Sequence, residues 1–202
     1  MFVMKYRNSA LLMLLFIIVC LKSTGQSFDL NKEISSVKIS GTSNLHDWEM
    51  HLSDFDCSVT FKSDNSVLKE ISKVTFSCKS GDIKSNNSIM DRKTYAALNA
   101  ESYPEIKFHS LTSNGIKTVN SKFSGTLIGN LLIAGISKAV AVTFTGLVTN
   151  TEGKKEVSVS GSVEIQMSDF KISPPTAIMG TLKTGNKVLL SFSLYFLQQS
   201  IN

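Results

Sequence analysis

The sequence of 202 residues lacks the short motifs that mark the common catalytic sites. It contains no G-x-S-x-G, no Walker loop, no G-x-G-x-x-G and no C-x-x-C. These absences argue against a hydrolase nucleophile elbow, a phosphate-binding loop, a dinucleotide site and a thioredoxin-like redox pair. The sequence therefore favours a protein that is not an enzyme.

Charge is scarce and nearly balanced. Charged residues make up 18% of the chain against 42% hydrophobic residues, which is too little charge for a disordered chain and enough apolar material for one domain with a core. The formal charge is +5, but Lys5, Arg7 and Lys22 lie in a 25-residue N-terminal segment that contains no acid. Without them, 18 basic residues face 16 acidic ones, a net charge of +2. Such a domain lacks the electrostatic footprint of a nucleic-acid binder, so we expect no nucleic-acid partner.

Long apolar runs are absent except at the N-terminus, where residues 1–25 have the layout of a secretory signal peptide. After Lys5 and Arg7 comes an unbroken apolar run of twelve residues at 10–21. Ser23 and Gly25 are the small residues that suit a cleavage before residue 26. We therefore expect a signal peptide at 1–25 and a mature domain at 26–202.

Two other interpretations of this N-terminal segment are weaker. Twelve apolar residues span about 18 Å as a helix, short of a hydrocarbon core of roughly 30 Å, so we expect no permanent membrane anchor. A lipoprotein acylated at Cys20 is less favoured because the bulky Val19 precedes that cysteine. We expect the mature protein to be periplasmic or secreted.

Residues of alternating polarity follow the signal segment. The clearest runs are 157–167 and 188–196, and weaker ones lie at 34–40, 46–62, 70–79, 105–112, 119–129 and 138–149. Period-two alternation is typical of strands with one buried face. Eight such runs predict an all-β fold, and long runs joined by short turns favour an eight-stranded antiparallel barrel over a sandwich. The breaks that read as turns are Ser113-Asn114-Gly115, Ala134-Gly135, Glu152-Gly153 and Thr184-Gly185.

Residues 81–104 depart from this pattern. Ser88, with Asp91 three residues later, resembles a helix N-cap, and Met90, Thr94, Ala97 and Leu98 share one helical face. We expect one short helical crossover that covers the wall or the mouth of the barrel.

The cysteines allow a test of strand register. A hairpin centred near Val67–Leu68 places Cys57 directly opposite Cys78, with both on the apolar face. Opposed cysteines in an exported protein lie within plausible disulfide distance. Two reduced, buried cysteines are the alternative.

The histidines do not indicate a metal site. His46 and His51 are five residues apart, so on a regular strand their side chains point to opposite faces. We therefore expect no metal and no cofactor other than a bound lipid. An enzyme that uses His46 or Asp47 as acid or base is the least favoured hypothesis, since nothing pairs these residues with a nucleophile.

A ligand cavity has better support. The strand positions that face inward hold large apolar residues together with glycines. A glycine at such a position leaves space inside the barrel because it has no side chain. The inward candidates are Phe61, Phe76, Phe108, Phe123, Gly125, Leu127, Phe144, Gly146, Val163 and Phe192. The alternative is that the glycines only mark bends of the strands. Trp48, the only tryptophan, is interpreted first as a plug at one end of the core and second as a ligand contact.

Four motifs resemble the exported YceI-like family. They lie at 40–48 (SGTSNLHDW), 90–108 (from MDR to YPEIKF), 129–138 (GNLLIAGISK) and 168–172 (SDFKI), in the family's order over roughly 30–198. The Ser-Asn-Leu-His-Asp-Trp opening departs from the His-Leu-Gly-Phe type of the better-known branch.

The resemblance implies an extended lipocalin-like barrel around a long apolar tunnel and a polyisoprenoid or isoprenoid quinone-like ligand. It makes Met90, Tyr95 and Leu98 candidates to line the mouth. We therefore expect a carrier or storage protein for an apolar lipid. The alternative is an accessory protein with a filled barrel that contacts a partner through Ile178 and Met179, and the sequence leaves a homodimer open.

Overall fold

The computed structural model describes residues 26–64, 67–151, 154–177 and 180–198. The predicted signal peptide, Cys20, Ile178 and Met179, as well as the break at Glu152-Gly153, lie outside these residues. The described part of the chain is predominantly β-structure with one α-helix, as expected.

The strands follow one another with few interruptions. They are β1 (Gln26–Leu30), β2 (Ser36–Ser43), β3 (Trp48–Leu52), β4 (Asp56–Asp64), β5 (Val67–Lys79), β6 (Ile83–Lys84), β7 (Glu105–Val119), β8 (Lys122–Ile133), β9 (Ile136–Thr151), β10 (Lys154–Gln166), β11 (Thr176–Ala177) and β12 (Leu182–Gln198). The helix α2 (Ser88–Ala97) lies between β6 and β7, and short 3-10 turns occupy Ser80–Asp82 and Met167–Phe170.

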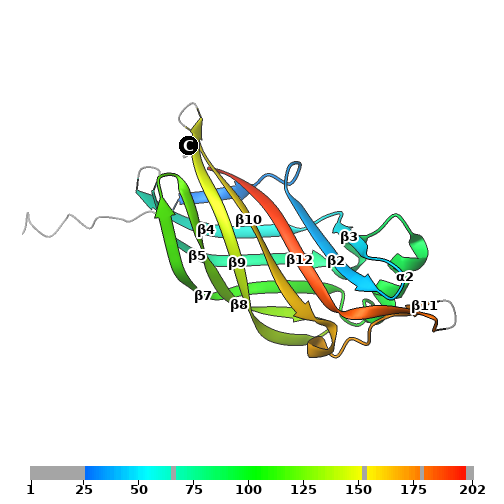
Figure 1. Cartoon of the computed structure of the whole chain (residues 1–202). Helices are drawn as coiled ribbons and strands as arrows, with labels where there is room; N and C mark the ends of the chain where they lie inside the picture. Colours follow the sequence, from blue (N-terminus) through cyan, green and yellow to red (C-terminus); the bar gives the residue numbers. More distant parts are fainter. Residues whose placement is uncertain (1–25, 65–66, 152–153, 178–179, 199–202) are drawn as a thin grey trace, which may run out of the picture.

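The sheet is antiparallel and curls back on itself. Its strand order is β1-β4-β5-β7-β8-β9-β10-β12-β2-β3-β6, and β1 also pairs with β12 (Figure 1). Because β1 borders both β4 and β12, the path of hydrogen-bonded strands returns to its start. This confirms the expected antiparallel barrel.

The strand count differs from the expected eight. β1 and β2 follow each other along one edge of β12, and the pairs β3–β4 and β5–β6 are likewise consecutive. Each pair is one long strand divided by a short irregular segment, of which Ser53–Phe55 and the 3-10 turn at Ser80–Asp82 are two. The run expected at 46–62 is therefore split in two. With each of these pairs counted as one strand, the barrel has eight strands, and β11 is a short additional strand beside β12.

The expected turns are partly confirmed. Ala134 and Gly135, with φ of 48° and 76°, form the two-residue turn between β8 and β9. The turn expected at 113–115 is wrong, because β7 continues through Gly115 with a register shift between Asn114 and Lys117. Gly115 has a φ of 62°, which suits a bulge, and the chain reverses at Asn120 instead. The turn expected at Thr184-Gly185 is also wrong, because both residues lie within β12, where the register shifts between Thr184 and Val188.

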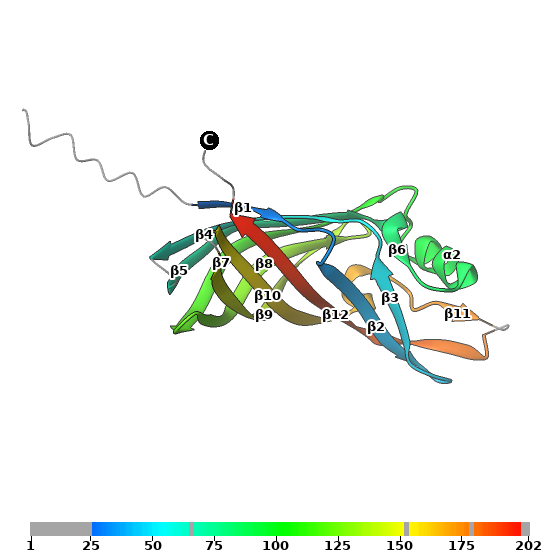
Figure 2. The same cartoon turned by 90° about the horizontal axis from the view of Figure 1, so that it is seen from above.

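The N-cap of the helix lies one residue earlier than expected. Asn87 is the N-cap, and its side-chain oxygen accepts hydrogen bonds from the backbone N–H groups of Ile89 and Met90. Asp91 instead accepts bonds from the backbone and hydroxyl of Ser85, which fixes the entry to the helix. Figure 2 shows α2 at one end of the barrel, beside β3 and β11, and β1 at the opposite end.

The β1 end of the barrel is filled by aromatic rings. Phe61 packs edge-on against Phe28, with ring centroids 5.1 Å apart, and against Phe196 at 5.5 Å. All three side chains are buried. Edge-to-face contacts of this kind add to the stabilisation that burial provides. Because the three buried rings fill it, this end of the barrel is closed.

Within the described residues, no helix combines the length and the apolar character needed to cross a bilayer.

Candidate functional site: an apolar cavity that opens beside the helix

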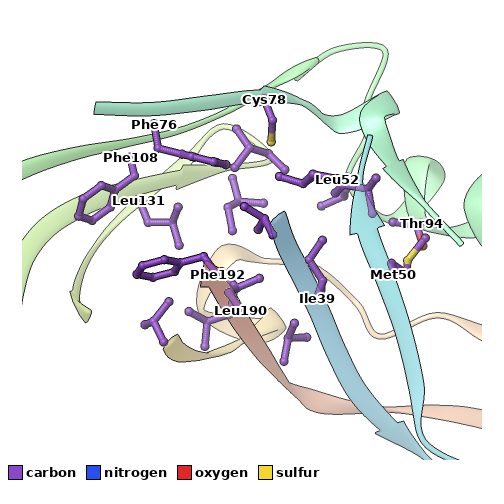
Figure 3. Close-up of a pocket in the computed structure, with 18 of the residues that line it drawn as sticks. Ile39, Met50, Leu52, Phe76, Cys78, Thr94, Phe108, Leu131, Leu190 and Phe192 are labelled. Atoms are coloured by element: carbon purple, nitrogen blue, oxygen red, sulfur yellow. The ribbon is translucent and has the colours of Figure 1, made fainter. Parts of the chain in front are cut away.

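The barrel encloses a cavity of about 450 Å³. Its wall is built from the inward parity of the strands together with one face of α2. Figure 3 shows Phe76, Phe108 and Phe192 with Ile39 and Leu190 around one common space. The volume lies in the range of small-molecule sites, and the apolar wall suits a hydrocarbon.

The mouth of the cavity lies at the α2 end of the barrel. Five of the described residues that line the cavity are exposed to solvent, and all lie at the α2 end; we call them the mouth residues, and they are His46, Asn87, Ile89, Lys93 and Thr176. Phe61 and Phe196 line the cavity at the other end and close it there. Among the described residues, the exposed part of the cavity wall therefore lies at the α2 end.

Most of the sequence-predicted site residues line this cavity. They are Trp48, Phe61, Phe76, Met90, Leu98, Phe108, Leu127, Phe144, Val163 and Phe192. Tyr95, Phe123, Gly125 and Gly146 are not part of its wall. The alternative of a filled core disagrees with the cavity.

Gly146 and Gly161, two glycines of the inward parity, do not provide the space of the cavity. At Gly146 a Cβ atom would clash with the ring of Phe123, which lies opposite it in the β8–β9 register, and would lie 2.6 Å from the carbonyl oxygen of Ser158. At Gly161 a Cβ atom would lie 2.6 Å from Cζ of Phe192. A phenyl ring from the neighbouring strand thus covers each glycine. A large side chain introduced at Gly146 would displace the barrel wall, so it cannot serve as a simple block of the cavity.

Tyr95 points toward the segment before the helix and does not line the cavity. Its hydroxyl lies 2.9 Å from the carbonyl oxygen of Ile83 and 3.1 Å from that of Gly81, and it accepts a bond from Nζ of Lys84 at 2.8 Å. Tyr95 therefore anchors α2 to the segment before it.

The opposite face of the helix contributes to the cavity wall. Met90, Thr94, Ala97 and Leu98, which the sequence places on one face, all line the cavity. The Thr94 hydroxyl lies 3.4 Å from the sulfur of Met50 on β3, a contact shown in Figure 3. The helix thus lies over the barrel as a cover whose inner face is apolar.

Trp48 lines the cavity and also packs against β2. Its ring lies over Gly41, where a Cβ atom would be 2.8 Å from Cε2 of the indole. The indole N–H donates to the carbonyl oxygen of Thr42 at 3.0 Å, which supplies the acceptor that a half-buried tryptophan needs.

The turn between β2 and β3 is held by its own side chains. The Ser43 hydroxyl accepts from the backbone N–H groups of Leu45 and His46 and donates to the carbonyl of His46 at 2.7 Å. Asn44 bridges to the start of β12: its amide donates to the carbonyl of Thr181, and its oxygen accepts from the N–H of Lys183, both at 2.8 Å. Through these bonds, the Ser-Asn-Leu-His segment fixes the conformation of the β2–β3 turn on one side of the mouth.

The predicted pairing of the cysteines is wrong. Cys57 lies opposite Phe76, and the structure holds Cys57 and Cys78 as free thiols. Asp64 pairs with Val67, so the pairing is centred earlier than assumed, and bulges in β4 and β5 recover only part of the offset. The final offset of two residues keeps the same face inward, so both cysteines still line the cavity. Burial raises the pKa of each thiol to about 12, with the charge of Asp82 adding to the rise at Cys78.

Sequence reasoning missed many aliphatic wall residues. Examples are Val37, Ile39, Val74, Val140, Val159 and Leu190, which all line the cavity. Each belongs to a run whose alternation is visible in the sequence. Their position on the inward face of the strand could therefore have identified them, whereas the selection of large side chains did not. The irregular segments that follow β10 also contribute, through Met167, Ile172 and Pro175.

The histidines occupy different surroundings. His46 is a mouth residue, and its Nδ1 lies 2.7 Å from the carbonyl oxygen of Asp47. His51 lies on the outer face of β3, with Nε2 3.6 Å from Glu49. In the described part of the chain, no three His, Cys, Asp or Glu side chains gather as a metal site requires.

Solved structures of similar fold support this architecture. A crystal structure of Burkholderia cenocepacia BcnA aligns with a TM-score of 0.59 and 19% identity over 83% of this chain and 99% of its own. The Campylobacter jejuni YCEI protein aligns with a TM-score of 0.61 and 22% identity over 74% of this chain and 84% of its own.

A third structure of similar fold is described as a polyisoprenoid binding domain from Saccharophagus degradans. It aligns with a TM-score of 0.61 and 9% identity over 86% of this chain and 99% of its own. At these identities the likeness shows the lipocalin-like fold alone. No curated protein matches the sequence.

The sequence itself decides the family. Residues 28–196 match the YceI-like domain, which is most of the chain and covers every strand that lines the cavity. The chain belongs to the YceI-like family.

Proposed function

We propose that this protein is an exported, non-enzymatic carrier or store for a long apolar ligand, a polyisoprenoid or isoprenoid quinone-like lipid. The observation that carries the proposal is the cavity of about 450 Å³, whose wall is apolar and whose mouth lies beside α2. Burial of each CH₂ group of a ligand there contributes about 0.8 kcal/mol. The cavity therefore favours long hydrocarbon chains.

Two further observations support the proposal. The Saccharophagus degradans domain of the same fold is described as polyisoprenoid binding. The layout of residues 1–25 supports export, and the absence of catalytic motifs from the sequence supports binding without chemistry.

The single tryptophan provides the test. Trp48 lines the cavity, so a ligand that enters changes its fluorescence. Titration with geranylgeraniol, an uncharged isoprenoid alcohol, is expected to give a saturable change. A titration without saturation below the solubility limit of the alcohol would contradict the proposal.

Matched variants distinguish the cavity from the outer surface. Val163→Phe adds a ring on the cavity side of β10, whereas Ser162→Phe adds the same ring to the neighbouring residue of opposite parity, which does not line the cavity. Loss of space for two or more CH₂ groups weakens binding by about tenfold or more in the first variant. The second variant is expected to bind as the unmodified protein does. Equal affinities in both variants would place the ligand elsewhere.

A further inference from the structure

The cavity wall carries charge of one sign only. Among the described residues that line it, Lys93 and His46 are the only side chains that can become cationic, and no aspartate or glutamate is present. Both are mouth residues. The apolar interior of the cavity therefore ends at a rim that has basic side chains and no acidic ones.

The Lys93 ammonium group is available to a ligand. Its Nζ donates to the carbonyl oxygen of Thr176 at 2.6 Å. None of the ion pairs between described residues involves it. An ammonium group has three donor hydrogens, so two remain after the bond to Thr176, and the described residues supply no anionic partner for the charge.

Two backbone donors of the helix at this rim are already used. The backbone N–H groups of Ile89 and Met90 at the start of α2 donate to the side chain of Asn87, which caps the helix. The positive group that remains for a ligand on the helix side is therefore Lys93. Ile89 and Met90 also line the cavity, so an apolar surface leads inward from the charged rim.

We propose that the mouth selects amphiphiles with an anionic head, a carboxylate or a phosphate, on a single apolar tail. This inference rests on the proposed function for the tail and adds the chemistry of the head. The tail occupies the cavity, and the head lies at the rim and accepts hydrogen bonds from Nζ of Lys93. His46 stands on the β2–β3 turn, a separate element of the same rim.

Tail-matched ligands test the head directly. Geranylgeraniol, geranylgeranoic acid and geranylgeranyl monophosphate share one tail and differ in the charge of the head. Each is titrated below its aggregation concentration, with Trp48 fluorescence as the readout, at low and at high salt. Because Lys93 is exposed, we expect the charged heads to bind about fivefold more tightly than the alcohol at low salt, with the advantage reduced by salt.

Variants assign the effect to one residue. Lys93→Gln removes the charge and keeps a donor for Thr176, so the advantage of the anions should disappear while affinity for the alcohol stays unchanged. Lys93→Arg should restore the advantage. Arg92→Gln is the matched control, because it removes the same charge from the preceding residue of α2, which does not line the cavity.

The outcomes separate the two proposals. Saturable binding of all three ligands with equal affinity would overturn the anionic head and leave the apolar cavity intact, whereas no binding of any ligand would overturn both. An advantage that persists in Lys93→Gln would overturn the role of Lys93. A preference for the acid alone or for the phosphate alone identifies which of the two heads the mouth accepts.

Discussion

Phe123 on β8 lies across Gly146 on β9, the residue directly opposite it in the strand register. The phenyl ring occupies the space into which a side chain at Gly146 would project. Phe192 covers Gly161 in the same way across β10 and β12. A glycine and a phenylalanine on adjacent strands thus form one packing unit of the barrel wall.

This unit predicts a large effect of one methyl group. Gly146→Ala forces the new Cβ against the Phe123 ring and the carbonyl oxygen of Ser158. We expect the free energy of unfolding to fall by about 1–3 kcal/mol, as in other overpacked cores. Urea denaturation followed by circular dichroism measures the change.

Gly81 supplies the control for this experiment. Nothing lies within 4 Å of a Cβ atom built there, so Gly81→Ala should leave stability unchanged within about 0.5 kcal/mol. Equal stabilities of the two alanine variants would show that the Phe123 ring does not fill the space above Gly146.

Tyr95 is predicted to affect stability without affecting binding. Tyr95→Phe removes the hydroxyl bonds to Lys84 and to the carbonyl of Ile83 and leaves the ring in place. Loss of these bonds should cost about 1 kcal/mol in the free energy of unfolding. Because Tyr95 does not line the cavity, the affinity for geranylgeraniol in a Trp48 fluorescence titration should not change. Weaker binding with unchanged stability would return Tyr95 to the binding site.

Asn44 is predicted to hold the mouth in shape. Asn44→Ala removes two hydrogen bonds that join the β2–β3 turn to Thr181 and Lys183. Hydrogen exchange should become faster at the amide of Lys183, which loses its acceptor, by roughly five- to tenfold for each kcal/mol of lost protection. Amides in the middle of β8 should exchange as before. Uniform acceleration across the barrel would instead indicate global destabilisation.

The buried thiols predict a pH dependence of stability. Burial raises the pKa of Cys57 and Cys78 from the ordinary value of 9.0 to about 12. Between these values the unfolded chain releases thiol protons that the folded chain retains, so the free energy of unfolding falls as pH rises above 9. Below pH 9 the thiols contribute no pH dependence.

A comparison of variants isolates this effect from other titrating groups. Urea denaturation at pH 8 and pH 10.5 should show a smaller loss of stability in the Cys57→Ala, Cys78→Ala double variant than in the unmodified protein. Identical losses would show that the thiols titrate alike in the folded and unfolded states.

The sequence was sufficient for the face of each strand but not for its partner. Alternation assigned Phe76, Phe108 and Phe192 to the interior, and all three line the cavity. Register depends on bulges, and residues such as Lys73, with a φ of 51°, carry no sequence signal that places a bulge there. Cys57 and Cys78 were therefore assigned to the correct face and to the wrong partners.

Glycines and helix ends show a second limit. A glycine on the inward face reads as missing volume, whereas the ring that fills the space above Gly146 comes from another strand. Similarly, Ser88 and Asn87 are both good N-caps, and only the position of the side chain decides between them. The face of α2 that lines the cavity was predictable from its period, but the direction of Tyr95 depends on its hydrogen bonds to Lys84 and Ile83.

The most direct test of the account is native mass spectrometry of the protein purified gently from its own host. The account predicts an added apolar mass that disappears after organic extraction and returns on incubation with an isoprenoid lipid. Val163→Phe should lower the occupancy and Ser162→Phe should not. An unchanged, ligand-free mass both before and after incubation with isoprenoid lipids would contradict the central claim that the cavity holds an apolar ligand.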